Sequence, residues 1–261
     1  MALDATGSEV ARPVAICRGL ALPLGLLLLW EVSSHSGLFN PQFLPPLEQV
    51  ATTAWREWAS GEMLSDLLIS LRRDLSGFAI GTGFGVAVGL LLGLSPVFDR
   101  IFTPWFNGLK QIALLAWIPL ISIWFGFDEA AKIVFVALAA AIPVILNTLE
   151  GIRLTSRKIL EVGDVFKFNR RQLIALVYLP SALPSILTGL HLALIYSWLA
   201  TIGAEYFMAA GQGIGGLVIA GRERFEMDLV LLGIVILGLT GFVLDRLASW
   251  LEYRLVPWGR P

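Results

Sequence analysis

Charged residues are scarce in this chain of 261 residues. Only 15% of them are Asp, Glu, Lys or Arg, whereas 56% are hydrophobic. A soluble domain carries about a quarter charged residues, so this chain has too little polar surface to cover a globule in water. The hydrophobic residues gather in long runs, which predicts an all-α integral membrane protein. The formal net charge of −1 argues against a nucleic-acid partner.

Cysteine and histidine are nearly absent. Cys17 is the one cysteine, which excludes an internal disulfide. The two histidines, His35 and His191, lie far apart, and no Cys/His cluster with metal-ligand spacing exists. We therefore expect no metal site, with His35 in a solvated loop and His191 on a helix face. We also expect no catalytic residue, because a membrane enzyme would need clustered His, Asp or Glu near a membrane surface.

A nucleotide-binding motif is also missing. No Gly-x-x-x-x-Gly-Lys-Ser/Thr occurs in the chain, so we expect no ATP site here. The glycine-rich stretch 211–216 has no Lys-Ser/Thr after it and no predicted strand before it. We interpret this stretch as a flexible re-entrant or surface loop on the outer side of the membrane.

Six apolar runs approach the length of about 20 residues that a membrane-spanning helix needs. They cover residues 15–33, 75–94, 108–126, 131–150, 184–206 and 229–249. A cleaved signal peptide is the alternative for the first run, because Arg12 and Arg18 precede its apolar segment. Glu31 follows without a clean small-x-small cleavage site, so we favour a retained span. Pro119 and Pro143 lie within the third and fourth runs and predict kinks there.

Lysine and arginine are unevenly distributed between the predicted inner and outer segments. With the N-terminus inside, thirteen of these residues fall on the inner side, Lys110 among them, and six on the outer side, including Arg73 and Lys132. The segment 151–183 alone holds six of the inner ones. Cytoplasmic loops carry the excess of Lys and Arg. Both termini and this segment are therefore predicted to be cytoplasmic, in a multi-pass protein of the inner membrane.

The outer segment after the first run opens with a proline-rich turn that includes Pro45-Pro46. From Leu47 to Trp58, apolar side chains then recur at helical spacing. This pattern predicts a short amphipathic helix at the outer interface, where Trp rings settle. The alternative is a rim that meets a delivery protein.

Glycine recurs at every fourth position of the second run. The positions are Gly77, Gly81, Gly85, Gly89 and Gly93. This spacing places them on one helix face, where missing side chains let another helix approach closely. We favour simple packing, and a sliding contact between moving helices is the alternative.

Polar residues inside apolar runs are candidates for function because a bilayer makes them costly. Glu205, near the outer end of the fifth run, is the strongest candidate for a gate or pathway residue. The alternative for Glu205 is a carboxylate that simply reaches the interface. Asn147 in the fourth run is a second pathway candidate, although such residues more often join helices by hydrogen bonds.

The charged segment between the fourth and fifth runs is the most informative part of the chain. It begins at Glu161 and ends with Val177 and Leu179-Pro180. This order resembles the cytoplasmic loop of ATP-binding-cassette (ABC) importer permeases. That loop opens with Glu-Ala-Ala, has Gly six residues after the Glu and closes on an apolar residue, any residue, Leu and Pro. Here Val162-Gly163 replaces the two alanines and Lys167 replaces the glycine.

Other stretches carry the same resemblance. They are Trp124-Phe125-Gly126, Asn147-Thr148, the Leu-Pro-x-Ala-Leu-Pro-x-Ile pattern of residues 179–186, and Glu205 with its glycine-rich follower. The resemblance covers most of the chain, from about Leu44 to Trp250, and is strongest with the sulfonate, taurine and nitrate branch, with aliphatic sulfonate permeases nearest. The resemblance adds Trp124 to the pathway candidates.

The resemblance implies a type I ABC importer permease fold with about six transmembrane helices. Residues 1–70 would form an N-terminal tail, the first span and the outer amphipathic segment. Residues 71–255 would form the permease core, with a cytoplasmic coupling loop at 151–183. The implied partners are a second copy of the chain, two cytoplasmic ATPase subunits that hold ATP and Mg, an external substrate-binding protein and membrane lipid.

The implied substrate is a small anion, foremost an aliphatic sulfonate. Taurine, nitrate and a thiamine precursor are alternatives that the sequence leaves open. A secondary transporter is an alternative of another class, although it would usually show an internal repeat and buried coupling charges.

The resemblance also assigns residues to ATPase coupling. They are Glu161, Val162, Gly163, Asp164, Lys167, Leu179 and Pro180. We expect a short helix whose charged face meets the ATPase while Val162, Val165 and Phe166 pack inward or into a groove. The family glycine allows a left-handed turn that is unfavourable for Lys167. The helix is therefore expected to run past Lys167 into Phe168, or to stop at Asn169.

Overall fold

The computed structural model describes residues 7–208 and 211–255, with side chains from residue 21 onward. Within these ranges every regular element is helical and no strand occurs. The α-helices are α1 (Gly7–His35), α2 (Leu47–Ser60), α3 (Glu62–Leu94), α4 (Pro96–Leu109), α5 (Ile118–Phe125), α6 (Glu129–Arg153), α7 (Arg157–Val165), α8 (Arg170–Leu173), α9 (Leu179–Phe207), α10 (Ile214–Arg224) and α11 (Met227–Leu255). A 3₁₀ turn, η1 (Leu114–Trp117), precedes α5, and a π-helical turn, η2 (Ile174–Tyr178), joins α8 to α9.

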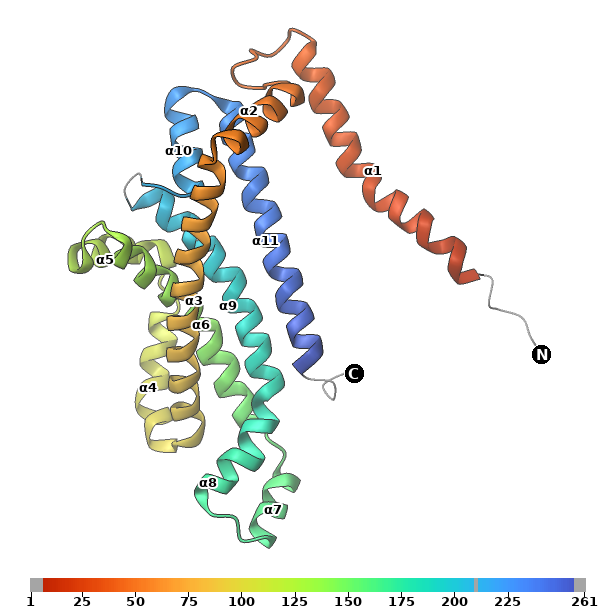
Figure 1. Ribbon diagram of the computed structural model, residues 1–261. Coiled ribbons are helices and arrows are strands. Elements are labelled where there is room, and N and C mark those ends of the chain that lie inside the picture. The colour runs from red at the N-terminus through yellow and green to blue at the C-terminus, as the bar shows by residue number, and fades with distance from the viewer. Residues whose placement is uncertain (1–6, 209–210, 256–261) are drawn as a thin grey trace.

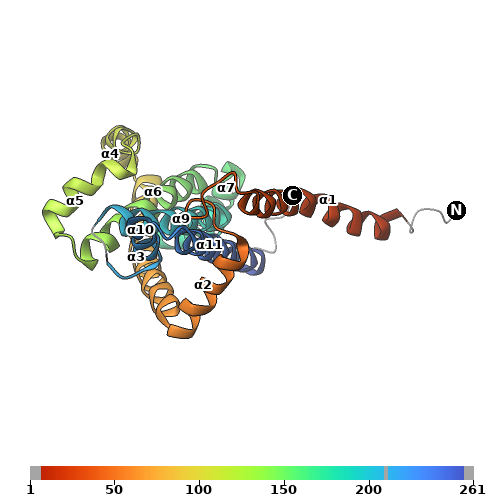
Figure 2. The same cartoon turned by 90° about the horizontal axis from the view of Figure 1, so that it is seen from above.

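Three long helices, α3, α6 and α9, pack side by side as the core of the molecule (Figures 1 and 2). With α11 and the continuous segment Arg170–Phe207, four helical segments are long and apolar enough to cross a membrane. The apolar runs predicted at 75–94, 131–150, 184–206 and 229–249 lie inside them. α3 begins at Glu62, so the division placed at residue 70 falls within a helix.

The apolar run predicted as one span at 108–126 does not form a continuous helix. The chain instead forms α4, a turn at residues 110–113, and then η1 and α5, and the two helical parts are bent by 96°. They form one broken span or a re-entrant segment, which brings the number of crossings to as many as five among the described residues. The polar pair Lys110-Gln111 interrupts the apolar run at the bend. Pro119 lies in the first turn of α5, where proline starts a helix, and so produces no kink within one.

The first predicted run, 15–33, lies within α1, although the side chains of residues 7–20 fall outside the described part. α1 points away from the bundle, joined to it through α2 (Figures 1 and 2). Its described apolar side chains, among them Leu22, Leu28 and Leu29, are exposed. In a membrane, such a surface needs lipid or another helix against it.

The five regularly spaced glycines lie on the face of α3 that contacts α6. A Cβ atom at Gly85 would lie 2.8 Å from Val144 Cβ, and one at Gly89 would lie 2.6 Å from Thr148 Cβ. Gly77, Gly81 and Gly93 face α6 just as closely. Backbones can approach in this way only where side chains are missing, so the glycine face sets the α3–α6 distance.

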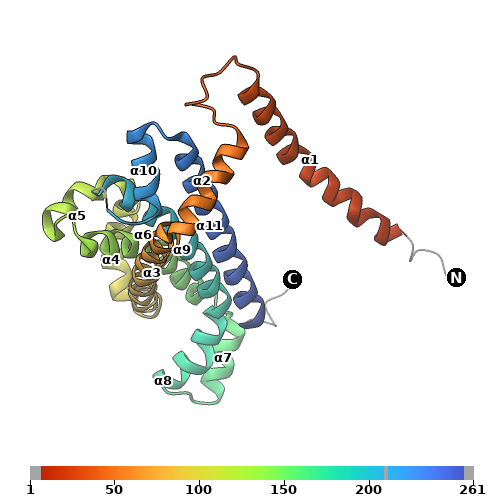
Figure 3. The ribbon, with the colours of Figure 1, turned by 45° about the horizontal axis from the view of Figure 1, so that its top comes forward.

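The end of the bundle that bears α2 and α10 lies opposite the end that bears α7 and α8 (Figures 1 and 3). α2 is the amphipathic helix predicted after the first run, and its Trp55 and Trp58 are exposed. Thr53, on its buried side, donates a 2.5 Å hydrogen bond to Asp228 at the start of α11. We call the α2 end the outer end and the α7 end the inner end.

Candidate functional site

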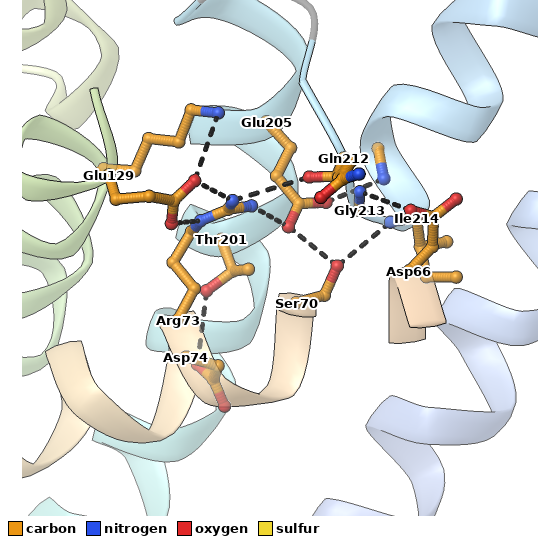
Figure 4. Close-up of polar contacts among 12 residues, drawn as sticks. Asp66, Ser70, Arg73, Asp74, Glu129, Thr201, Glu205, Gln212, Gly213 and Ile214 are labelled. Atoms are coloured by element: carbon orange, nitrogen blue, oxygen red, sulfur yellow. Dashed lines mark hydrogen bonds and ion pairs between the residues drawn. The ribbon is translucent and has the colours of Figure 1, made fainter. Parts of the chain in front are cut away.

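A polar cluster, buried at Arg73 and Glu205 but 61% exposed at Glu129, joins α3, α6 and α9 at the outer end (Figure 4). Arg73 of α3 lies at its centre and is only 1% exposed. Its guanidinium donates to both carboxylate oxygens of Glu129, at 2.9 and 2.5 Å, and also to Glu205 of α9. A bidentate pair of this kind fixes the geometry of both partners. Arg73 therefore ties the outer ends of three helices together.

Glu205 is buried within this cluster and is 2% exposed. Its carboxylate accepts hydrogen bonds from Ser70 Oγ at 2.7 Å and from the backbone N–H of Gly215 at 2.7 Å, in addition to the Arg73 contact. The interpretation of Glu205 as a carboxylate that reaches the interface is therefore wrong. Its role as a gate stays a prediction.

The glycine-rich stretch completes the cluster. The backbone N–H of Gly213 donates to Asp66 at 2.9 Å, and that of Ile214 donates to Ser70 at 3.0 Å. These groups open α10, whose first N–H groups have no partner within the helix. Residues 211–216 are therefore held in place by side chains of α3 and α9, where the sequence predicted a flexible loop. A Cβ atom at Gly213 would lie 2.6 Å from Glu205 Oε1, so the close approach requires glycine.

The charges in the cluster compensate one another. Lys132 Nζ lies 3.9 Å from Glu129, so two cations face two carboxylates. Asp74, one helical position beyond Arg73, is fully buried, with one carboxylate oxygen 3.4 Å from Thr201 Oγ1. Burying charges is costly unless they are paired and hydrogen-bonded, which holds for Arg73 and Glu205, whereas the second carboxylate oxygen of Asp74 is buried without a hydrogen-bond partner among the described residues.

Sequence reasoning missed most of this cluster. Asp66, Ser70, Arg73 and Asp74 repeat at helical spacing along one face of α3. They precede residue 75, where the predicted apolar run begins, and Arg73 alone among them enters the sequence analysis, as a residue of the outer side. The helical spacing of these polar residues in the sequence is the pattern that would have predicted a shared polar face on α3.

The other two pathway candidates lie apart from the cluster. Asn147, in the inner half of α6, donates a 2.8 Å hydrogen bond to the carbonyl of Pro143 and lines a cavity of about 450 Å³. Trp124 lies on α5 with 64% of its surface exposed, and it is not among the residues that line this cavity. The structure therefore separates Glu205, Asn147 and Trp124.

The predicted coupling segment forms α7 at the inner end. Glu161 and Asp164 are exposed on it, whereas Gly163 is buried against Leu173. Leu179 and Pro180 start α9 directly after the π-helical turn. Sequence positions 161 to 180 therefore form one helical hairpin that projects from the bundle (Figure 3).

Both predictions for the end of α7 are wrong. The helix ends at Val165, and Lys167 itself adopts the left-handed conformation, with φ of 52°. The N–H of Phe168 bonds to the Gly163 carbonyl, and the N–H of Lys167 bonds to Asp164, each at 3.0 Å. This pair of bonds is a Schellman motif with Lys where glycine is usual. Asn169 caps the start of α8.

The apolar residues of α7 do not pack inward. Val162 is exposed, as are Val165 at 80% and Phe166 at 69%. Phe166 stacks on Phe168 with ring centroids 5.9 Å apart, so the aromatic pair lies at the tip of the hairpin. The expectation of inward packing is wrong within this chain, and a groove on another protein is the remaining alternative.

The two histidines lie in different parts of the structure, each beside carboxylates. His35 ends α1, where a loop was predicted, and Glu31, His35 and Glu48 place possible ligand atoms within 4.8 Å of one another. Two of these three residues are exposed, and such groups are common without an ion, so the absence of a metal stays a prediction. His191 lies on the face of α9 and contacts Asp245 at 2.9 Å.

The comparisons with known proteins decide the family. Residues 81–257 match the family described as "Binding-protein-dependent transport system inner membrane component". This chain belongs to that family. It is an ABC importer permease with an all-helical, type I importer-like fold, and not a secondary transporter.

Two relatives bear the name "Putative aliphatic sulfonates transport permease protein SsuC". The one from Bacillus subtilis (strain 168) is 36% identical to this chain. The match covers 92% of this chain and 87% of the relative. The one from Escherichia coli (strain K12) is 38% identical over 91% of this chain and 90% of its own. A taurine permease of Escherichia coli (strain K12) is 32% identical, with 93% and 91% covered.

Among solved structures, the crystal structure of an amino acid ABC transporter with histidines superposes with a TM-score of 0.65. The match has 16% sequence identity and covers 77% of this chain and 98% of the other. At this identity the likeness concerns the fold alone.

Proposed function

We propose that this permease forms the translocation pathway for aliphatic sulfonates. The observation that carries the proposal is the identity of 36% and 38%, over more than nine-tenths of this chain, to two proteins named for aliphatic sulfonate transport. Taurine is itself a short alkanesulfonate with an amine, and the taurine permease is a slightly more distant relative. An anion with a sulfonate headgroup is therefore the common substrate class.

ATP hydrolysis takes place on separate subunits in this proposal. The chain has no P-loop sequence, so the energy must enter through a contact. The α7 hairpin supports such a contact because it combines exposed Val162, Val165 and Phe166 with the charges of Glu161 and Asp164. Apolar side chains at a hairpin tip outside the bundle gain most from burial in a groove of a soluble partner. ATP and Mg then bind to that partner.

A second copy of the chain and an external binding protein complete the proposed assembly. The exposed apolar side chains of α1, which stands away from the bundle, suit contact with lipid or with the second copy. The outer end, with α2 and α10, is the surface proposed for the binding protein. Both α1 and α11 run from this end toward the level of α7 (Figure 1), which supports termini on the cytoplasmic side.

Site-directed labelling tests this orientation. In a Cys17→Ser background, Ser156→Cys at the start of α7 should react with a membrane-impermeant maleimide only from the cytoplasmic side. Ser60→Cys, at the end of α2, should react only from the opposite side. Both positions are exposed. Labelling of both from one side would exclude the proposed topology.

An uptake assay tests the substrate. The complete transporter, reconstituted with its ATPase and binding protein, should accumulate labelled ethanesulfonate when ATP is supplied. Unlabelled alkanesulfonates should compete, and nitrate and a thiamine precursor should not. Uptake of nitrate or a thiamine precursor without sulfonate uptake would replace the proposed substrate, and competition by taurine alone would narrow it.

Charge reversal at Glu161 tests the coupling contact. Glu161→Lys places a cation where the proposal has an anion facing the ATPase, so uptake and stimulated ATP hydrolysis should fall together, by about tenfold or more. Glu150→Lys, an exposed carboxylate near the inner end of α6, is the matched control and should retain both rates. Insertion and dimer formation should be unchanged in both variants. Wild-type rates in Glu161→Lys would reduce α7 to a connector.

A further inference from the structure

One cavity lies where the broken span meets the core. It has a volume of about 450 Å³ and lies between the turn after α4, the middle of α6 and the middle of α9. Its polar lining consists of Lys110 and Gln111 from the turn, Asn147 from α6 and Tyr196 from α9. No carboxylate is among its lining residues. The cavity therefore offers one cation and three neutral polar groups.

The direction of α4 carries Lys110 away from the inner end and toward the middle of the bundle, whereas the sequence placed it in an inner segment. α4 starts just after α3 ends at the inner end and runs back along α3 (Figure 1). Its 14 residues rise about 21 Å, at 1.5 Å per residue, through a hydrocarbon layer about 30 Å thick. A lysine at that depth is too costly to face lipid and normally marks an ion or substrate path.

The donors of this cavity, which opens to the surface at Gln111 and at Tyr196 (51% exposed), are free for a ligand. Within residues 21–208 and 211–255, the Lys110 ammonium makes no ion pair or hydrogen bond, and neither do the Gln111 amide and the Tyr196 hydroxyl. Asn147 uses its amide only toward Pro143. This differs from the outer cluster, where every charged side chain has a partner of opposite sign or a hydrogen bond.

The rest of the cavity wall is aliphatic. It includes Ile112, Leu114, Ile142, Leu146 and Leu192. A ligand that fits both parts has an anionic headgroup with several acceptor oxygens and a short alkyl chain. An inorganic anion would fill the cationic end and leave the aliphatic wall without contact.

The two other cavities described lack this combination. The cavity of about 600 Å³ at the outer end is lined by Arg56 and Arg224 but also by four carboxylates, Glu57, Glu62, Asp66 and Glu226. The groove of about 560 Å³ between α9 and α11 is apolar, with Asp245 as its charged residue. Neither attracts an anion, since acidic groups outnumber cations in both.

We propose that the cavity at Lys110 is a transit site for alkanesulfonates within the membrane. The Lys110 ammonium pairs with the sulfonate, Gln111, Asn147 and Tyr196 offer hydrogen bonds to its oxygens, and the aliphatic wall holds the alkyl chain. This proposal rests on the proposed function for the identity of the cargo. The cavity thereby gives the permease a selectivity of its own, beyond that of a binding protein.

Transport by charge variants is the first test. In the reconstituted transporter, Lys110→Gln should lower ethanesulfonate uptake at least tenfold, and Lys110→Arg should stay within about threefold of wild type. Arg100→Gln, an exposed cation on the preceding helix α4, is the matched control and should leave uptake unchanged. Equal uptake by wild type and Lys110→Gln would overturn the transit site while leaving the proposed function intact.

Chemical labelling tests the cavity without relying on transport. Ala113 lines the cavity, so Ala113→Cys in a Cys17→Ser background places a thiol in it. We compare the labelling rates of 2-sulfonatoethyl methanethiosulfonate, itself a short alkanesulfonate, and of uncharged methyl methanethiosulfonate. Lys110→Gln should lower the ratio of the anionic to the neutral rate about tenfold, and free butanesulfonate should slow labelling only when Lys110 is present.

A thiol outside the cavity supplies the control. Thr52→Cys, exposed on α2, should give the same ratio of rates with and without Lys110. An unchanged ratio at Ala113→Cys after Lys110→Gln would overturn the transit site. A changed ratio in a transporter that carries no sulfonate would keep the anion site and reject the proposed function.

Discussion

Two regions of this permease, the outer half around Arg73 and the inner half around the Lys110 cavity and the α7 tip, differ in how their central charges are placed, although Arg153 and Asp99 form an ion pair on the inner side. At the outer end, Arg73 is enclosed and shares two carboxylates with α6 and α9. Deeper in the bundle, Lys110 meets no carboxylate among the described residues, and at the inner end Val165 and Phe166 are exposed. A buried charge that the chain neutralises itself fixes how the helices pack and makes the loss of either partner costly. A charge or apolar tip left without a partner is available to a ligand or another subunit.

The largest effect should come from breaking the outer cluster. Arg73→Met leaves Glu205 buried without its counter-charge, which costs about 3–5 kcal/mol. Thermal unfolding of the purified permease in detergent should show a corresponding loss of stability, or the variant should fail to assemble. Arg72→Met, the exposed neighbour, is the matched control and should stay within about 0.5 kcal/mol of wild type.

A double variant separates charge from packing. Arg73→Met combined with Glu205→Gln removes both buried charges and should recover part of the loss, because an unpaired charge is the main cost. If Arg73→Met and Arg72→Met were equally stable, the outer cluster would not hold the helices together, and the comparison between the two halves would fail.

A side chain added on the glycine face of α3 should lower stability by less than the loss of Arg73. Gly85→Leu forces a side chain against Val144 and the Ala141 carbonyl, where a Cβ atom alone would lie 2.8 and 3.0 Å away. Overpacking of this kind costs about 1–3 kcal/mol, and adjustment of α3 against α6 should also impair assembly. Gly83→Leu points into open space and is the control. Equal melting temperatures for the two variants would show that α3 and α6 are not held at a fixed distance.

One substitution in the α7 hairpin should raise stability, whereas the substitutions above lower it. Lys167→Gly removes the penalty of a left-handed residue, about 1 kcal/mol, and should stabilise the hairpin. Lys158→Gly, within α7, should destabilise it by a similar amount because glycine is a poor helix former. Hydrogen exchange of the α7 amides measures both changes. Slower exchange in Lys158→Gly than in Lys167→Gly would contradict the assigned turn.

The smallest effect on stability should come from Lys110. Lys110→Gln removes a charge that has no partner among the described residues, so the free energy of unfolding should change by less than about 0.5 kcal/mol, although transport falls. A loss comparable to that of Arg73→Met would show that Lys110 supports the fold, and the two halves would then not differ.

The amino-acid sequence by itself determined the helices. Apolar runs of about 20 residues and glycine at every fourth position report local geometry, so α3, α6, α9 and α11 and a close-packing face on α3 were predictable, whereas the structure shows that α6 is the helix packed on that face. The amphipathic α2 followed from helical periodicity, whereas the short helix of the coupling segment was expected from the resemblance to the family loop. The resemblance of residues 161–180 to the family loop added the partners, which periodicity does not specify.

Only the tertiary structure decided which charges are paired. Arg73 and Glu205 are 132 positions apart, and their contact requires α3 and α9 to pack against each other and against α6. The bend after α4, which places Lys110 in a cavity with Asn147 and Tyr196, likewise depends on neighbours distant in the chain. Hydropathy within a window measures the cost of placing a charge in lipid. Whether that cost is offset depends on groups that the window does not contain, because compensation acts through space.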